Sequence, residues 1–240
     1  MHHTMTAATD TGSVRRMNQD CVCIVPELDV AVLADGLGGH QAGEIASRMS
    51  VDAITRHFGD RAAVAGAADA ADQMLEAVNA ANAEVYSNSR QFSHMEGMGT
   101  TVVAAHVCNG RVIIGHIGDS RCYRFRKGEL AQLTEDHTLA SRLLRGNPAG
   151  IVPDYSHHML DKALGTQPLC APDILDREVL PGDVLMLCSD GLSGVVADTE
   201  IAGILAHGSE DPESCVEGLI DACLKSGAPD NVSVILVRIR

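Results

Sequence analysis

The stretch TTVVAAHVCNGRVIIGHIGDS, residues 100–120, decides the fold class of this chain. Two runs rich in β-branched residues, 100–107 and 111–117, flank the dipeptide Asn109-Gly110. Asn-Gly favours a tight turn with positive φ at both residues, and such a turn joins antiparallel strands. Lys127-Gly128 predicts another turn shortly afterwards. The middle of the chain is therefore expected to form antiparallel β-sheet.

Helical patterns lie on both sides of this region. Apolar residues recur at helical spacing in two long segments before the hairpin and in two shorter ones near the C-terminus. The expected helices are 42–58, 61–89, 199–207 and 212–226, and the further expected strands are 183–188 and 232–239. Antiparallel strands with helices in pairs favour layers of helix packed on sheet over a doubly wound parallel fold.

Composition limits the classes of partner. The 240 residues carry a formal net charge of -14, which argues against nucleic acid or an anionic membrane surface as the main partner. Apolar residues make up 45% of the chain but aromatic residues only 2%, so the core is expected to consist of Ala, Val, Ile and Leu. No repeat or linker divides the chain, and we expect one domain over residues 1–240 with a flexible N-terminus at 1–10.

The eight cysteines indicate a reducing compartment. They include no C-x-x-C pair and lie scattered in apolar segments, which is typical of buried thiols rather than of a disulfide framework or a zinc site. The sequence also shows no signal peptide and no apolar run of about 20 residues. We therefore expect a cytoplasmic protein with reduced cysteines.

Five aspartates stand beside the ends of apolar runs, namely Asp20, Asp35, Asp119, Asp190 and Asp230. Any one of them, next to glycine or asparagine, is explained by a turn. Together they would place several carboxylates at one end of a sheet, where like charges must either take up protons or bind cations. Oxygen ligands without a Cys/His cluster favour Mg²⁺ or Mn²⁺ over zinc.

The segment ADGLGGHQAGE, residues 34–44, places glycines directly after one of these aspartates. Glycine weakens a fold unless another group must approach the backbone closely. Asp35 is therefore expected to bridge two metal ions, and the glycines beyond it to let a main-chain carbonyl reach one of them.

Seven motifs occur in the order found in one enzyme family. They are GSVRRMNQD (12–20), ADGLGGHQAGE (34–44), GMGTT (97–101), IGDSR (117–121), LTEDHT (133–138), SDGL (189–192) and DN (230–231). In this order they resemble the bacterial PP2C-like (PPM) metal-dependent serine/threonine phosphatases, from about Thr11 to the C-terminus. The resemblance implies an α+β fold, an αββα sandwich in which two antiparallel β-sheets are flanked by pairs of helices. That fold agrees with the predicted hairpin.

The resemblance also implies roles for the metal-binding residues. Asp35 matches the aspartate that bridges the two metals, and Gly36 matches the residue whose carbonyl binds the second metal. Asp190 and Asp230 match the ligands of the first metal. Asp20 matches an acidic position that holds the second metal directly or through water.

Three further positions follow from the same resemblance. Asp119 matches a ligand of an additional metal, shared with Asp190. Arg15 matches the arginine that binds the substrate phosphate, and it has the family's spacing to Asp20, whereas the neighbouring Arg16 does not. His40 resembles a histidine proposed as a proton donor, and the alternative that it only begins a helix stays open.

The function implied by the resemblance is metal-dependent hydrolysis of phosphoserine and phosphothreonine in proteins, with a hydroxide between the metals attacking phosphorus. It implies two core Mn²⁺ or Mg²⁺ ions and a third, weaker one. The expected partners are phosphorylated proteins, including a bacterial Ser/Thr kinase or its substrates, and the expected state is a monomer that binds neither nucleic acid nor membrane. Two alternatives remain: a non-catalytic phosphoprotein-binding module on the same fold, and a hydrolase of small phosphoesters.

Two segments depart from the family pattern. Gln19 stands where many members have glutamate, so more of the second metal site falls to Asp20 and water. Residues 138–162 are expected to form a flap beside the cleft, but SHHMLDKALG (156–165) only partly resembles the usual sequence there. Asp136-His137 matches the family's DH pair, for which we expect a structural role near the flap.

Overall fold

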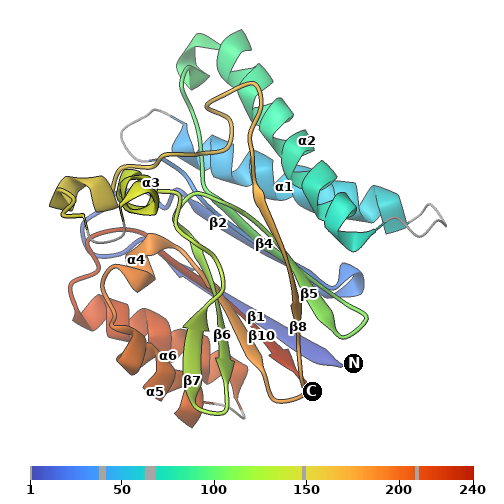
Figure 1. Cartoon of the computed structure of the whole chain (residues 1–240), viewed down its shortest axis with the longest axis vertical. Helices are drawn as coiled ribbons and strands as arrows, with labels where there is room; N and C mark the ends of the chain where they lie inside the picture. The colour runs from blue at the N-terminus through green and yellow to red at the C-terminus, as the bar shows by residue number, and fades with distance from the viewer. Residues whose placement is uncertain (1, 38–41, 63–68, 148–149, 209–210) are drawn as a thin grey trace.

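The computed structural model describes residues 2–37, 42–62, 69–147, 150–208 and 211–240, and it contains two five-stranded antiparallel sheets packed face to face (Figure 1). The strand order is β1-β10-β9-β6-β7 in the first sheet and β2-β3-β4-β5-β8 in the second. The strands of the first sheet are β1 (His3–Asp10), β10 (Val232–Ile239), β9 (Val184–Cys188), β6 (Arg121–Arg126) and β7 (Glu129–Gln132). Those of the second are β2 (Asp20–Val25), β3 (Val30–Asp35), β4 (Val102–Cys108), β5 (Arg111–Ile117) and β8 (Asp173–Glu178).

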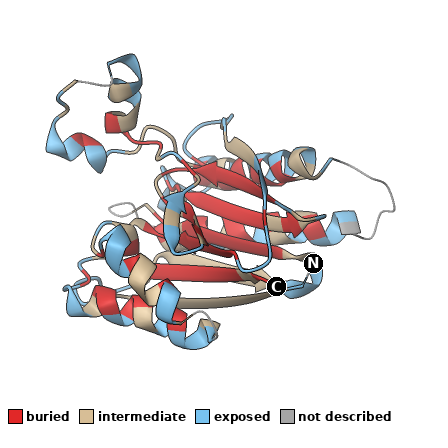
Figure 2. Ribbon diagram, turned by 60° about the horizontal axis from the view of Figure 1, so that its bottom comes forward, coloured by how far each residue is buried: buried red, intermediate tan, exposed pale blue. Residues whose placement is uncertain are grey.

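Helices cover the outer face of each sheet. Helices α1 (Gly43–Ala62) and α2 (Ala70–Gln91) pack on the second sheet, while α4 (Asp190–Ser193), α5 (Asp198–His207) and α6 (Pro212–Lys225) pack on the first. Helix α3 (Leu139–Gly146) and the 3₁₀ turn η3 (Asp154–His157) form a separate lobe, at the upper left of Figure 2. Two further 3₁₀ turns are η1 (Pro26–Leu28) and η2 (Ser93–Met95). The predicted αββα sandwich is confirmed.

The predicted hairpin is present in the second sheet as strands β4 and β5. Strands β4 and β5 pair antiparallel from Val102 opposite Ile117 to Cys108 opposite Arg111. Asn109 and Gly110, with φ of 49° and 75°, make the turn between them, as the Asn-Gly signal requires. The second predicted turn is also present, and it joins β6 to β7.

The core has three layers because the strands near the middle of each sheet are buried on both faces (Figure 2). In β3, alternate residues face opposite sides: Val30 and Val32 pack against the helices, whereas Ala31 and Leu33 lie between the two sheets. A strand covered on both faces needs a continuous apolar run, and this explains the unbroken run that precedes Asp35.

Two expectations about the N-terminal part were wrong. Residues 1–10 were expected to be flexible, but His3–Asp10 forms the edge strand of the first sheet and pairs along its whole length with β10. The alanine-rich segment was expected to be one helix from residue 61, but α1 continues to Ala62 and α2 begins at Ala70, capped by Asp69, whose side chain accepts a hydrogen bond from the N–H of Ala71. Residues 63–68, inside the expected helix, lie outside the described residues.

The cysteines and the helices also bear on cellular context. All eight cysteines are free thiols. None of the helices in the described part of the chain combines the length and the apolar character needed to cross a membrane.

Candidate active site

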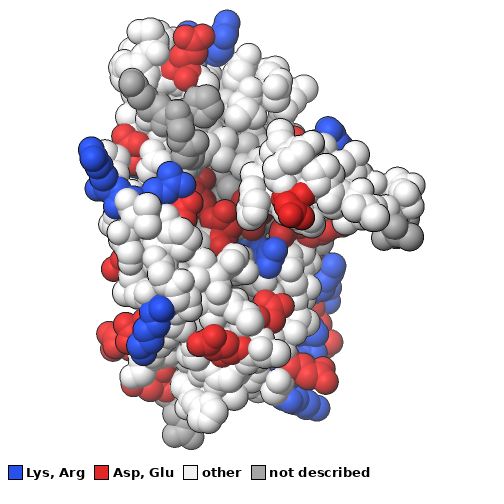
Figure 3. Space-filling model, turned by 90° about the vertical axis from the view of Figure 1, so that its left-hand side faces the viewer, with Lys and Arg blue, Asp and Glu red and all other residues white. Residues whose placement is uncertain are grey.

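A cavity of about 320 Å³ opens where strands of both sheets end. Four of the five predicted aspartates line it, together with Arg15 and Gly36. The four aspartates are Asp35, Asp119, Asp190 and Asp230. Figure 3 shows acidic side chains gathered in a hollow at the centre of this face of the molecule. The strands therefore bring together residues that are far apart in the sequence.

The end of β3 is held by hydrogen bonds from the GMGTT segment. The N–H of Asp35 donates to Oγ1 of Thr101, and Oγ1 of Thr100 donates to the carbonyl oxygen of Asp35, at 3.0 and 2.7 Å. Gly36 follows in a narrow space, where a Cβ atom would lie 2.3 Å from the carbonyl oxygen of Gly43. Only glycine fits this close approach of two backbones, which accounts for the Asp-Gly pair at the mouth of the strand.

Asp20 lies directly opposite Asp35 in the β2–β3 ladder. It does not line the cavity itself, but its Oδ2 accepts a hydrogen bond of 2.9 Å from the hydroxyl of Ser189. Its Oδ1 is buried and has no hydrogen-bond partner among the described residues. A buried carboxylate oxygen without a donor is costly, so this atom is available to a ligand.

The carboxylates repel one another strongly. Burial and then the charges of Asp20, Asp190, Asp119 and Asp230 raise the pKa of Asp35 well above its usual range. Burial, followed by the Asp190 charge, raises the pKa of Asp119 to about 7, and burial raises the pKa of Asp20 to about 6. Without cations, these groups would hold protons near neutral pH.

Arg15 reaches the cavity from the loop between β1 and β2. Its Nη2 donates to Oδ2 of Asp230 at 2.7 Å, and this hydrogen bond raises the pKa of the guanidinium. Arg16 does not line the cavity. The structure therefore brings Arg15, rather than its neighbour, to the aspartates. Its role in binding the substrate phosphate stays a prediction.

Two residues that the sequence interpretation did not assign organise the site. Oδ1 of Asn231 accepts from the N–H of Gln19, and its Nδ2 donates to the carbonyl oxygens of Thr11 and Met17. Asn231 thereby fixes the loop that carries Arg15. Ser189, besides contacting Asp20, accepts from the N–H of Ser233 at 3.0 Å. The motifs DN and SDGL contained both residues, but a lone amide or hydroxyl gives no sign of its distant partners.

Other predicted positions fall outside the cavity or outside the described residues. His40, with Gly38 and Gly39 before it, is among the residues that the structure does not describe. The flap, residues 138–162, contains α3 and η3, and His158 from this segment lines the cavity. A second hollow of about 310 Å³ shares His158 and three of the aspartates and extends between the flap and α4. This second hollow, a groove along the flap, therefore shares four lining residues with the cavity.

Comparison with known proteins gives matches along nearly the whole chain. Residues 13–214 match the family described as Protein phosphatase 2C. Serine/threonine phosphatase stp of Listeria monocytogenes is 33% identical over 235 residues, 95% of this chain and 93% of that protein. Serine/threonine protein phosphatase PstP of Mycobacterium tuberculosis is 36% identical over 234 residues, 96% of this chain but 44% of that protein.

Solved structures agree with these sequence matches. The catalytic domain of PstP, determined in complex with two manganese ions, superposes with a TM-score of 0.87 at 33% identity, covering 99% of both chains. Stp1 from Staphylococcus aureus superposes with a TM-score of 0.90 at 29% identity, covering 100% of this chain and 96% of the other. The chain therefore belongs to the protein phosphatase 2C family of serine/threonine phosphatases.

Proposed function

We propose that this phosphatase hydrolyses phosphoserine and phosphothreonine in proteins with divalent cations held by its five aspartates. The observation that carries the proposal is the convergence of four carboxylates on the buried Asp35. Such a cluster is stable at neutral pH only when protons or cations neutralise it.

The residues present fit a pair of Mn²⁺ or Mg²⁺ ions. Every donor is an oxygen atom, as these hard cations require. The unpartnered Oδ1 of Asp20 and the raised pKa of Asp35 both mark a place where positive charge would be stabilised. We propose Asp35 as the bridging ligand, Asp190 and Asp230 as ligands of the first ion, and Gly36 and Asp20 as ligands of the second, Asp20 directly or through water.

The reaction also requires an activated water molecule and a group that binds the phosphate. Bound divalent cations supply the charge that makes a water molecule a nucleophile near neutral pH and that neutralises the phosphoryl oxygens. Arg15 offers a planar guanidinium that can donate to two phosphoryl oxygens at once. Its hydrogen bond to Asp230 keeps the guanidinium facing the cavity, where the phosphate must lie. His40 lies outside the described residues, and its role as a proton donor stays a prediction.

Asp119 is proposed to hold a third, weaker ion together with Asp190. Asp119 lines both hollows, as Asp190 does, and burial followed by the charge of Asp190 raises the pKa of Asp119. Two carboxylates with water as the remaining ligands would bind an ion loosely, because the number of ligands governs affinity.

We further propose that the enzyme acts as a cytoplasmic monomer on phosphorylated proteins, including a bacterial Ser/Thr kinase or its substrates. The free thiols support a reducing compartment, and the bacterial relatives support such a pathway. The groove between the flap and α4 offers room for residues next to the phosphorylated side chain.

The test uses a phosphothreonine peptide, p-nitrophenyl phosphate and a nucleoside triphosphate with the purified chain. We expect turnover of the first two with Mn²⁺ or Mg²⁺, complete loss with EDTA and recovery when the metal is restored. Activity in rigorously metal-free protein would contradict the metal assignment. Preferred turnover of the nucleotide would instead indicate a hydrolase of small phosphoesters.

A further inference from the structure

A second cluster of ionisable side chains lies behind the cavity. His116 in β5, His137 before α3 and Asp173 at the start of β8 bring one ligand atom each within 4.8 Å of one another. The ring centroids of His116 and His137 are 4.7 Å apart, and the ring planes are tilted by 32°. None of the three lines the aspartate cavity. The cluster could be a metal site, or it could hold another part of the site in place.

The hydrogen bonds of His137 argue against a metal. Its Nδ1 accepts a hydrogen bond of 3.1 Å from the N–H of Gly118, so this nitrogen carries no proton. In a neutral ring the proton is then on Nε2, which faces Oδ2 of Asp173 at 3.3 Å. A metal-binding histidine usually donates from its second nitrogen, and here that nitrogen accepts. The ammonium group of Lys162, 3.4 Å from Nε2, already supplies a cation.

The same contacts fix Gly118 from two sides. Besides the bond to Nδ1, the carbonyl oxygen of Gly118 accepts from the backbone N–H of His137 at 2.8 Å. Gly118 has a φ of +110°, and a Cβ atom there would lie 2.7 Å from Cβ of Thr101. The next residue is Asp119. His137 therefore holds Gly118 through both its main chain and its ring. The conformation of Gly118 in turn sets the direction of Asp119 beyond the end of β5.

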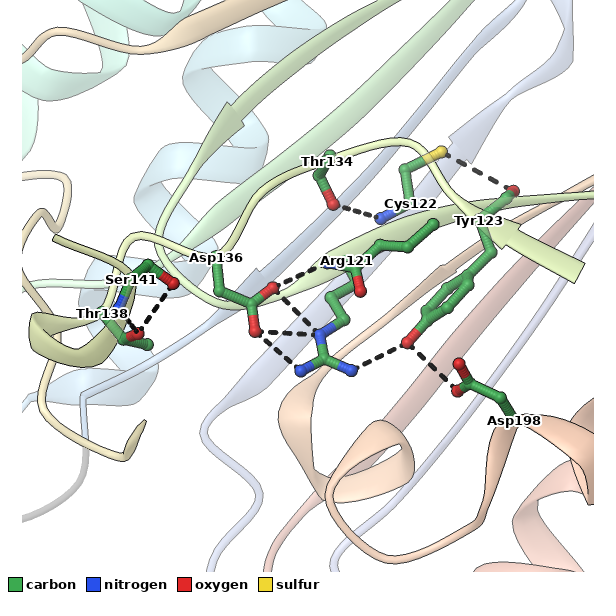
Figure 4. A network of polar contacts seen from close by, with 9 residues as sticks. Arg121, Cys122, Tyr123, Thr134, Asp136, Thr138, Ser141 and Asp198 are labelled. Carbon is green, nitrogen blue, oxygen red and sulfur yellow. Dashed lines mark hydrogen bonds and ion pairs between the residues drawn. The ribbon is translucent and has the colours of Figure 1, made fainter. Parts of the chain in front are cut away.

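On its other side, the His137 segment contacts the end of the flap. The carbonyl oxygen of His137 accepts from the N–H of Asp161, and the N–H of Leu139 donates to the carbonyl oxygen of Met159, at 2.8 and 2.7 Å. The preceding residue, Asp136, is held by two nitrogens of Arg121 (Figure 4). His137 thus sits between the turn that carries Asp119 and the base of the flap.

We propose that His137 is a positioning residue whose neutral ring, protonated on Nε2, holds Gly118 and so aims the carboxylate of Asp119 into the cavity. This inference rests on the proposed role of Asp119 in the third metal site. His137 does not touch the substrate, and its effect on the reaction passes through the backbone of Gly118.

Two substitutions at His137 test the contributions of the two ring nitrogens separately. In His137→Asn the amide oxygen can take the place of Nδ1 and accept from Gly118, whereas in His137→Gln the amide lies near the place of Nε2. We expect His137→Gln to lower kcat on a phosphothreonine peptide about 10- to 100-fold, because small displacements of catalytic groups have effects of this size. His137→Asn should recover most of that loss. Asp173→Asn, which removes the charge facing Nε2, should stay within about twofold of wild type.

Further measurements separate positioning from folding. Calorimetry should show the two tight Mn²⁺ ions in both His137 variants and a weakened third ion only in His137→Gln. ¹⁵N NMR of the wild-type ring should show an unprotonated Nδ1 and a protonated Nε2, which tests the inference even if a variant does not fold. The opposite tautomer, or equal loss of kcat in the two variants, would overturn it. If Asp119→Ala keeps its kcat, the proposed role of Asp119 fails first, and a low kcat of His137→Gln would then need another cause.

Discussion

Asp20 and Asp35 face each other across β2 and β3, and both carboxyl groups are buried at the same mouth of the sheet. Two such groups cannot both be ionised there without a cation. The carboxylates of the site therefore destabilise the folded protein when no metal is bound.

Asp35→Asn should stabilise the metal-free protein while abolishing activity. The amide is neutral in the folded and the unfolded state, so folding no longer has to protonate a carboxylate whose pKa burial and four other carboxylates raise. We expect the melting temperature in EDTA to rise by about 3–6 °C, as for 1–2 kcal/mol in a chain of this size. Calorimetric scans with and without Mn²⁺ check this, since the variant should no longer respond to the metal. A lower melting temperature in EDTA would show that the Asp35 carboxylate is stabilising.

Stabilisation by metal should grow with pH. The pKa values of Asp20 and Asp119 are raised in the folded protein to about 6 and about 7, so their contribution to stability is present below pH 4 and is lost as pH rises through those values. Burial lowers the pKa of His116 to about 4, so His116 makes the folded protein less stable as pH falls below 6.5. This effect is the same with and without metal. The difference in melting temperature between Mn²⁺-loaded and metal-free protein should therefore increase from pH 5 to pH 8. A constant difference would count against proton–metal competition.

Arg15→Ala should weaken the binding of substrate rather than of metal. Loss of a charged hydrogen bond to the phosphate is expected to raise KM for a phosphothreonine peptide about tenfold or more. Arg16→Ala is the matched control, because this neighbour does not line the cavity. Steady-state kinetics of both variants measures KM, and Mn²⁺ titration measures their affinity for the metal. The assignment is wrong if only Arg16→Ala raises KM.

Asp119→Ala should keep the two tight ions and bind the phosphopeptide but hydrolyse it much more slowly. The third ion that Asp119 is proposed to hold would be lost, whereas the ligands of the core pair remain. If the side chain served only the turn after β5, the variant would lose about 1 kcal/mol of stability and keep its kcat. Calorimetry for metal stoichiometry, together with kcat at saturating Mn²⁺, distinguishes these outcomes.

Gly36→Ala should destabilise the protein, because the added Cβ would lie 2.3 Å from the carbonyl oxygen of Gly43. Overpacking against backbone typically costs about 1–3 kcal/mol. Gly203→Ala is the control: a Cβ there meets nothing within 4 Å, and alanine in helix α5 should stabilise by about 0.5–1 kcal/mol. Urea unfolding of both variants measures the contrast. Equal stabilities would refute the steric account of Gly36.

The sequence predicted the central hairpin, and most of the residues that gather at the cavity, because their signals are local. The Asn-Gly turn, the apolar run before Asp35 and the spacing of the family motifs all lie within short segments. It could not predict that His3–Asp10 is a strand, since the partner, β10, lies at the other end of the chain. The hydrogen bonds of Asn231 to Thr11 and of His137 to Gly118 were not predicted, because no local pattern records such distant partners. For His137 the sequence predicted only a structural role near the flap.

The pairing of β1 with β10 also bears on synthesis of the protein. Thr9 and Ser233 share a hydrogen bond across 224 positions of the chain, and Asn231 closes the loop of Arg15 from the same end. While residues 230–239 are still inside the ribosome, a nascent chain lacks Asp230 and lacks β10, the strand that pairs with both β1 and β9. The emerging polypeptide should therefore neither bind metal tightly nor hydrolyse phosphoproteins until the last strand has left the ribosome.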